Sequence, residues 1–340
     1  MDLYSTTALV ATVENLLLPQ TFLLERFFPR AVFSETAAVA IDVFTGKRRL
    51  APFVNPLREG RYVESLGFQT TEFVPPTIKD KRRLDPLRAV RRAMGERIGG
   101  ALNPQQRAAA NLGLELQDQL GMVMRRMEWM AANALASSAV TIVGDGYPPV
   151  TIGFGRDPSL TVTLTGSNRW GQAGIYPTDM LDAWALQVGM TSGRQVTDVV
   201  FTNGAWKAFR ADPRVAQIIG SLVNGNADFS AAGVRANTGA KRLGMWGDYQ
   251  LWLYNEWYID PVDNLQKPML PDGTVLLGSP DIDGTRAFGV ILDEDIGFPV
   301  QGFAPKSWVE KDPGVRWLLM QSAPLTIPTN VNASFAAQVL

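Results

Sequence analysis

Residues 103–136 read NPQQRAAANLGLELQDQLGMVMRRMEWMAANALA and carry the clearest helical pattern in this chain of 340 residues. Asn103 is a good N-cap, and Pro104 suits the first helical position, where no hydrogen bond is lost. Apolar side chains then recur at helical spacing, at Leu112, Leu116, Leu120, Val123, Met127, Met130 and Ala134. The pattern predicts one helix of about 33 residues, or about 50 Å. Because a single face is apolar, we expect the helix to lie across a sheet or another element.

Residues 41–90, upstream of this helix, alternate β-like runs with prolines and basic clusters. The runs are Ile41–Phe44, Tyr62–Phe68 and Thr71–Val74 before Pro75, and the clusters are Lys47, Arg48 and Arg49, then Lys79, Lys81, Arg82 and Arg83. Alternation bounded by proline predicts a long hairpin that reaches away from a core. A solvated surface loop is an equal interpretation of the same residues.

Residues 1–40 predict an N-terminal arm with one short amphipathic segment. The arm carries Phe22, Leu23, Phe27, Phe28 and Phe33. A lone arm cannot bury so many large apolar side chains against itself. We therefore expect it to dock on its own subunit or on a neighbour.

The sequence downstream of the helix changes from β runs to a mixed pattern. Short β runs near residues 140–143, 150–154 and 160–164 are separated by turns. From residue 175 onward, helical and strand patterns alternate. The chain as a whole therefore predicts an α+β fold.

The composition excludes most of the usual catalytic chemistry, because the chain contains no histidine and no cysteine. Histidine dominates acid–base catalysis near neutral pH, and histidine and cysteine are the usual zinc ligands. Only carboxylates, Lys, Tyr, Ser and Thr remain for catalysis. We therefore expect a protein that binds, scaffolds or assembles rather than an enzyme, with no cofactor and no metal.

The charge of the chain is nearly balanced but unevenly distributed. A formal net charge of −1 argues against a dedicated nucleic-acid binder. Residues 1–100 carry 15 Lys and Arg against 11 Asp and Glu, whereas residues 241–340 carry 7 against 12. Opposite charges at the two ends suit contacts between copies of the chain. We expect no membrane span, since no apolar run approaches 18 residues, and no export signal.

Two alternative functions remain open on composition alone. A carboxylate-dependent enzyme, such as a glycoside hydrolase, could draw a catalytic pair from four aspartates, namely Asp272, Asp281, Asp283 and Asp293. A soluble adaptor or tail protein is the other alternative. The enzyme would leave the long helix and the basic hairpin unexplained, and the adaptor would not need so long a loop.

Several short motifs resemble, in order and spacing, the major capsid protein E family, the lambda-type major head proteins of tailed bacteriophages. The strongest lie between residues 176 and 325: YPTD at 176–179, VVF at 199–201, MWGD at 245–248, LPDGTVLLG at 270–278, PKSWV at 305–309 and MQSAPL at 320–325. The N-terminal YSTT at 4–7 follows the same order. Each motif alone is weak, but the set covers nearly the whole chain.

The resemblance implies an HK97-like fold with five parts. These are an N-terminal arm (1–40), an extended β-hairpin loop (41–90), a peripheral domain (91–174) with a spine helix at about 104–136, an axial domain (175–312), and a C-terminal strand (313–340) that returns to the peripheral domain. It also implies hexamers and pentamers that form the icosahedral head of a virion around double-stranded DNA, which they contact non-specifically. Assembly in the bacterial cytoplasm, with scaffold, portal and decoration proteins as separate chains, is part of the same expectation.

The subunit interfaces are expected to use the arm aromatics and the basic clusters. The candidate residues are Phe22, Phe27, Phe28, Lys47, Arg48, Arg49, Lys79, Lys81, Arg82 and Arg83. The basic side chains could meet acidic surfaces such as that of the C-terminal third. An exposed ion pair contributes only about 0–1 kcal/mol, but many repeated weak contacts can specify a shell.

Overall fold

Helix α4 (Pro104–Ser137) organises one half of the molecule in the computed structural model. The structure describes residues 4–16, 21–44, 50–62, 68–85, 87, 91, 102–144, 146–215, 227–228, 239–312 and 314–340. Asn103 accepts a hydrogen bond from the backbone N–H of Gln106, whose side chain accepts one from Asn103 in return. All seven residues of the predicted apolar stripe are buried, so the predicted helix is confirmed.

A buried arginine fixes the C-terminal end of α4. The last carbonyls of a helix have no partner within the helix. Arg156 donates from Nη1 to the carbonyl of Leu135 at 2.6 Å and from Nη2 to that of Ala136 at 2.8 Å. Burial lowers the pKa of Arg156 to about 10, so the side chain stays charged at neutral pH.

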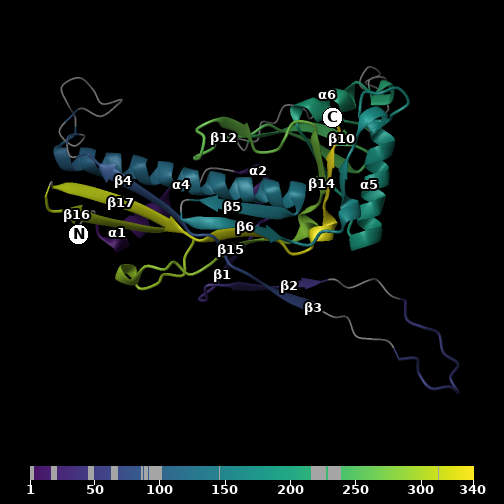
Figure 1. Cartoon of the computed structure of the whole chain (residues 1–340), viewed down its shortest axis with the longest axis horizontal. Helices are drawn as coiled ribbons and strands as arrows, with labels where there is room; N and C mark the ends of the chain where they lie inside the picture. The colour runs from purple at the N-terminus through teal and green to yellow at the C-terminus, as the bar shows by residue number, and fades with distance from the viewer. Residues whose placement is uncertain are drawn as a thin grey trace.

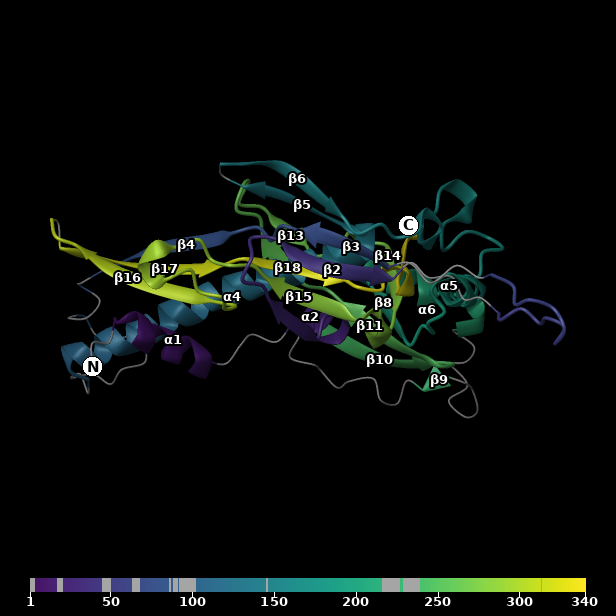
Figure 2. The ribbon, with the colours of Figure 1, turned by 90° about the horizontal axis from the view of Figure 1, so that it is seen from below.

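Two three-stranded sheets run beside α4. The first has the order β16 (Ala304–Glu310), β17 (Val315–Ser322) and β4 (Ile78–Leu84), and all its pairs are antiparallel. The second joins β1 (Arg30–Phe33), β15 (Gly284–Phe288) and β18 (Pro324–Pro328). Helix α1 (Thr6–Asn15) packs on β16 and α4, and Figure 2 shows it alongside the first sheet.

Three two-stranded hairpins complete the half of the molecule that contains α4. They are β2 (Val39–Phe44) with β3 (Phe68–Phe73), β5 (Ala139–Gly144) with β6 (Tyr147–Gly153), and β12 (Trp257–Ile259) with β13 (Gln266–Pro268). Figure 1 shows β2 and β3 leading to a loop that reaches away from the body. The structure differs from the expected 41–90 hairpin, because β4 leaves the hairpin to pair with β17.

The other half is a mixed seven-stranded sheet covered by helices. Its order is β7 (Thr161–Thr163), β19 (Phe335–Gln338), β14 (Thr274–Gly278), β8 (Asp198–Phe201), β11 (Tyr249–Tyr254), β10 (Ala240–Trp246) and β9 (Ala227–Asp228). Helices α5 (Pro177–Ser192) and α6 (Asn203–Arg210) pack on it around a second hydrophobic core. Within residues 313–340, β17 and β18 lie in the half that contains α4, whereas β19 joins the seven-stranded sheet, which we call the axial sheet.

The remaining helical elements are short. Helix α2 (Phe22–Phe27) belongs to the arm. Single 3₁₀ turns lie in the connections, at η1 (Pro158–Leu160), η2 (Gly166–Asn168), η3 (Pro280–Ile282), η4 (Glu294–Ile296) and η5 (Val331–Ala333). Helices and strands are thus mixed throughout, which confirms the α+β class.

Candidate subunit interface

Most of the large apolar side chains of the arm lie inside their own subunit, although Phe33 is 51% exposed. Phe22, Phe27 and Phe28 are at most 5% exposed and belong to the core around α4. Gly284 makes this close approach possible, because a Cβ there would lie 2.3 Å from the carbonyl oxygen of Phe27. The arm therefore docks on its own subunit. The structure corrects the choice of these three residues as interface candidates, since they offer almost no surface to a neighbour.

The tip of the β2–β3 hairpin has the opposite character. Leu50, Phe53, Leu57 and Tyr62 are 86–106% exposed. The loop has some local order, because Asn55 accepts hydrogen bonds from the backbone N–H groups of Leu57 and Arg58. Four large apolar side chains on one loop are a typical contact surface for another protein. The candidates Lys47, Arg48 and Arg49 lie outside the described residues.

Strand β4 divides its residues between two faces. Ile78, Asp80, Arg82 and Leu84 are half-buried, whereas Lys79, Lys81 and Arg83 are exposed. This alternation follows from the period of two in a β-strand. The basic cluster predicted from sequence is therefore split, and only its odd-numbered members face outward.

Arg82 is held by carboxylates of its own subunit. Its Nε donates to Asp80 at 2.9 Å, and its Nη1 donates to Glu115 and Asp118 of α4 at 3.0 and 2.6 Å. Burial alone would lower the pKa of Arg82, but hydrogen bonds to Asp118 and Glu115, together with Asp80, raise it above its ordinary value. Arg82 thus ties β4 to α4. The structure corrects its selection as an interface residue.

The outward face of β4 combines positive charge with aromatic rings. The Nζ atom of Lys81 lies 4.2 Å from the ring centroid of Trp317 and 5.2 Å from that of Trp308. Trp317 in turn donates from Nε1 to Glu310 at 2.8 Å. Such cation–π contacts restrain a lysine while leaving its charge at the surface. Lys79, Lys81 and Arg83 form what we call the basic face of β4.

The four aspartates considered for catalysis do not converge. Asp272 accepts a hydrogen bond from the backbone N–H of Gly204 at 2.7 Å, and Asp283 pairs with Arg30 at 3.2 Å. Asp293 pairs with Lys306 at 2.9 Å; burial alone would raise its pKa, but Lys306 and Gln321 hold it below its ordinary value. Asp281 lies in η3. The carboxylates of Asp272, Asp283 and Asp293 thus act as hydrogen-bond and ion-pair partners within the fold.

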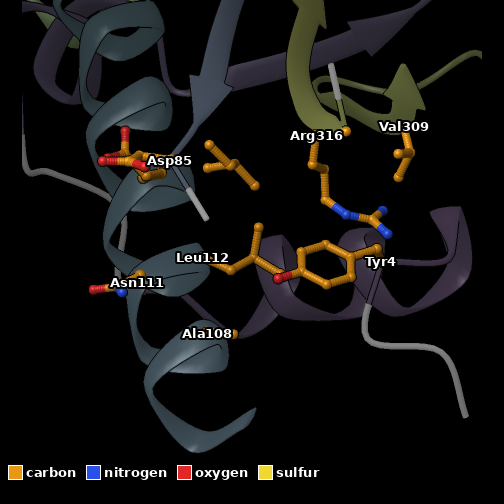
Figure 3. Close-up of a pocket in the computed structure, with 10 residues that line it drawn as sticks. Tyr4, Asp85, Ala108, Asn111, Leu112, Val309 and Arg316 are labelled. Carbon is orange, nitrogen blue, oxygen red and sulfur yellow. The ribbon is translucent and has the colours of Figure 1, made fainter. Parts of the chain in front are cut away.

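A cavity of about 260 Å³ lies between the arm, α4 and the β16–β17 hairpin (Figure 3). The guanidinium of Arg316 stacks 3.7 Å from the ring centroid of Tyr4, and Asn111 and Leu112 of α4 form another part of the wall. This arrangement is a packing contact between arm and sheet. Among the described residues, no cluster of acidic side chains is arranged to hold a metal ion, and no helix is long and apolar enough to cross a membrane.

Three of the structural contacts could not be predicted from the sequence. Glu128 is fully buried, and a charged residue four positions after Met124 on an apolar helix face was the available signal. Trp308 and Trp317 pair across one hairpin, at equal distances from its turn. The ion pair between Arg26 and Asp198 joins residues 172 positions apart, so no local pattern announces it.

A long helix beside two small sheets, a projecting hairpin and a mixed seven-stranded sheet together make up an HK97-like fold (Figure 1). The structure is similar to that of a prophage capsid protein of E. coli CFT073, with a TM-score of 0.77 at 19% identity over 98% of this chain and 99% of that one. It is also similar to a subunit of the bacteriophage PhiM1 mature capsid, with a TM-score of 0.52 at 9% identity over 95% and 88% of the two chains. These likenesses confirm the predicted HK97-like fold.

The family model for phage major capsid protein E matches residues 5–339. The chain therefore belongs to the phage major capsid protein E family, as the sequence motifs predicted. It is 27% identical to the major capsid protein of Escherichia phage lambda and 28% identical to that of phage N15, over 96% of each chain. The major capsid protein of Enterobacteria phage P21 is 25% identical over the full length of both chains. The role of the present chain is therefore structural, and the enzyme alternative has no support.

Proposed function

We propose that this major capsid protein assembles as hexamers and pentamers into an icosahedral phage head, using the loop 50–62 and the basic face of β4 for contacts between copies. The exposed apolar tip of the hairpin carries the proposal. Full burial of a large apolar side chain contributes about 1.5–3 kcal/mol, so Phe53, Leu57 and their neighbours supply a sizeable driving force once covered. Family membership supports self-assembly as the way in which they become covered.

The basic face of β4 supplies the second contact in this proposal. Lys79, Lys81 and Arg83 point outward, and Lys81 is held in place by two tryptophan rings. The C-terminal part of the chain, residues 241–340, carries an acidic excess. Complementary charge increases the rate of encounter and rejects wrong partners more than it raises affinity. We therefore assign orientation to this face and affinity to the loop.

Loss of the apolar tip tests the proposal directly. The double variant Phe53→Ser and Leu57→Ser should remain folded by circular dichroism but form no shells in size-exclusion chromatography and electron microscopy. Glu59→Gln is the matched control, because it alters the same loop without removing apolar surface, and it should assemble normally. Normal shells from the double variant would refute the role of the loop.

Charge reversal tests the second contact. Lys81→Glu with Arg83→Glu should slow assembly or produce misshapen shells, and the defect should change with salt concentration. Lys207→Glu, an exposed lysine of α6, is the matched control for a charge change elsewhere. Equal assembly rates in all three proteins at low salt would show that the basic face is only a solvated surface.

A phage head also requires partners other than the major capsid protein. We propose that scaffold, portal and decoration proteins are separate chains, that assembly takes place in the cytoplasm of the bacterial host, and that packaged DNA is contacted without sequence readout. The near-neutral net charge supports the last point. Tight binding that discriminates between duplex sequences at physiological salt would contradict it.

A further inference from the structure

Helix α2 of the arm is capped by a side chain from the spine helix. The backbone N–H groups of Leu23 and Leu24 donate to Oε1 and Oε2 of Glu128, each at 2.9 Å. The N-cap residue of α2, Thr21, makes no capping bond with its own side chain. The first N–H groups of a helix lack partners within the helix, so the Glu128 carboxyl group satisfies two of them from α4.

The same carboxyl group also contacts the axial sheet. The hydroxyl of Tyr254, on β11, donates to Oε1 of Glu128 at 2.9 Å. The ring of Phe22 lies 4.9 Å from that of Trp252 and 6.0 Å from that of Tyr254. Glu128 therefore lies where the arm, the spine helix and the axial sheet meet.

A second connection lies one turn further along α2. Arg26 donates from Nη2 to both carboxylate oxygens of Asp198 on β8, at 2.9 and 3.0 Å. Trp252 donates from Nε1 to Asp198 at 2.8 Å, and the Asp198 side chain is fully buried. Helix α2 is thus hydrogen-bonded to α4 at its beginning and, through Arg26, to the axial sheet near its end.

Within the described residues, the contacts of Glu128 are three hydrogen-bond donors and no cation. Tyr254 bonds to it, and Glu256 acts on it at longer range as a like charge. On α2, the carboxylate of Glu25 bonds to the N–H of Thr21, while Arg26 is engaged by Asp198. An ionised Glu128 is therefore a buried charge balanced only by hydrogen bonds, which is costly in a low-dielectric interior.

We propose that α2 is a latch between the spine helix and the axial sheet, and that the charge on Glu128 sets its strength. Both the ionised and the protonated form of the Glu128 carboxyl group can make the hydrogen bonds that this position offers. The carboxylate accepts all three hydrogen bonds, and the protonated group can donate to the Tyr254 oxygen while still accepting from the two N–H groups. The two forms differ in the cost of burying charge, so the protonated latch is the tighter one.

The direction of the pH dependence follows from that cost. Burial raises the pKa of Glu128 from 4.5 to about 7, in spite of the hydrogen bonds from Leu23, Leu24 and Tyr254 that lower it. When α2 is released, water reaches the group and the pKa returns toward 4.5. The docked state therefore binds the proton more tightly than the released state. As the pH rises from about 4.5 to about 7, the latch weakens, and above that range its strength levels off.

Hydrogen exchange of the full-length, unassembled chain tests the latch. The segment 21–28 is followed by mass spectrometry between pH 5 and 8, with correction for intrinsic exchange and with α4 residues 116–127 as an internal reference. In the wild type, protection of 21–28 should fall about tenfold per pH unit between pH 5 and 6.5, then level off. In Glu128→Gln, which cannot ionise, protection should not depend on pH.

Three further variants separate the latch from simple structural damage. Asp198→Asn should lower the protection of 21–28 at every pH without changing its slope. Tyr254→Phe removes one donor to the carboxylate, so the fall should extend to higher pH. Glu14→Gln, an exposed carboxylate of α1, should behave like the wild type. Wild-type protection that is independent of pH, or an unchanged slope in Glu128→Gln, would overturn the proposal.

Discussion

The arm and the hairpin loop are both N-terminal segments rich in large apolar side chains, yet the fold treats them in opposite ways. Phe22, Phe27 and Phe28 of the arm are buried in their own subunit, whereas Phe53 and Leu57 of the loop are almost fully exposed. The arm is therefore part of the subunit's own stability. The loop contributes no core, so its apolar surface is available for another molecule. Apolar composition alone does not separate the two roles. What separates them is whether the subunit itself provides a surface that covers the apolar side chains.

The largest effect on folding stability is expected from shortening one buried side chain of the arm. Phe27→Ala should lower the free energy of unfolding by about 3–5 kcal/mol, because it empties a fully buried site where the ring packs beside Gly278. Phe53→Ala should change it by less than about 0.5 kcal/mol. Chemical denaturation of both unassembled variants measures the difference. Equal losses would erase the distinction between arm and loop.

An intermediate effect is expected on the two faces of β4. Arg82→Glu brings a fourth carboxylate beside Asp80, Glu115 and Asp118 and should cost about 1–3 kcal/mol of folding stability. Arg83→Glu points outward and should leave folding stability within about 0.5 kcal/mol of the wild type while still impairing assembly. Urea midpoints of the two single variants check this. A stable Arg82→Glu protein would mean that the carboxylate cluster contributes little.

The smallest effect is expected at the cation–π contact. Lys81→Ala removes the charge from Trp317 and Trp308 and should cost about 0.5–1 kcal/mol. Lys81→Arg keeps the charge and can stack on the same rings, so it serves as the matched variant. Thermal unfolding compares the two. An equal loss in Lys81→Arg would show that packing of the lysine chain, and not its charge, is the source.

The parts of the fold that depend on interactions between residues close in sequence could be predicted. The Asn103-Pro104 start and the apolar stripe to Ala134 predict α4 because capping and periodicity act within a few turns. The pairing partner of β4 could not be predicted in this way, because that partner, β17, is more than 200 residues away in the sequence. For the same reason, local sequence places Arg82 in the hairpin, and the contacts of Glu128 with Leu23 and Tyr254 leave no signal beyond one charge on an apolar face.

Tryptic cleavage at Arg58 and Arg61 tests the central claim most directly, because both arginines lie in the exposed loop. The same purified protein is digested as unassembled subunits and as shells, and cleavage within 50–62 is followed by mass spectrometry. If the loop is a contact between copies, cleavage should be rapid in the subunit and at least tenfold slower in the shell. Equal cleavage rates in the two states would contradict the account.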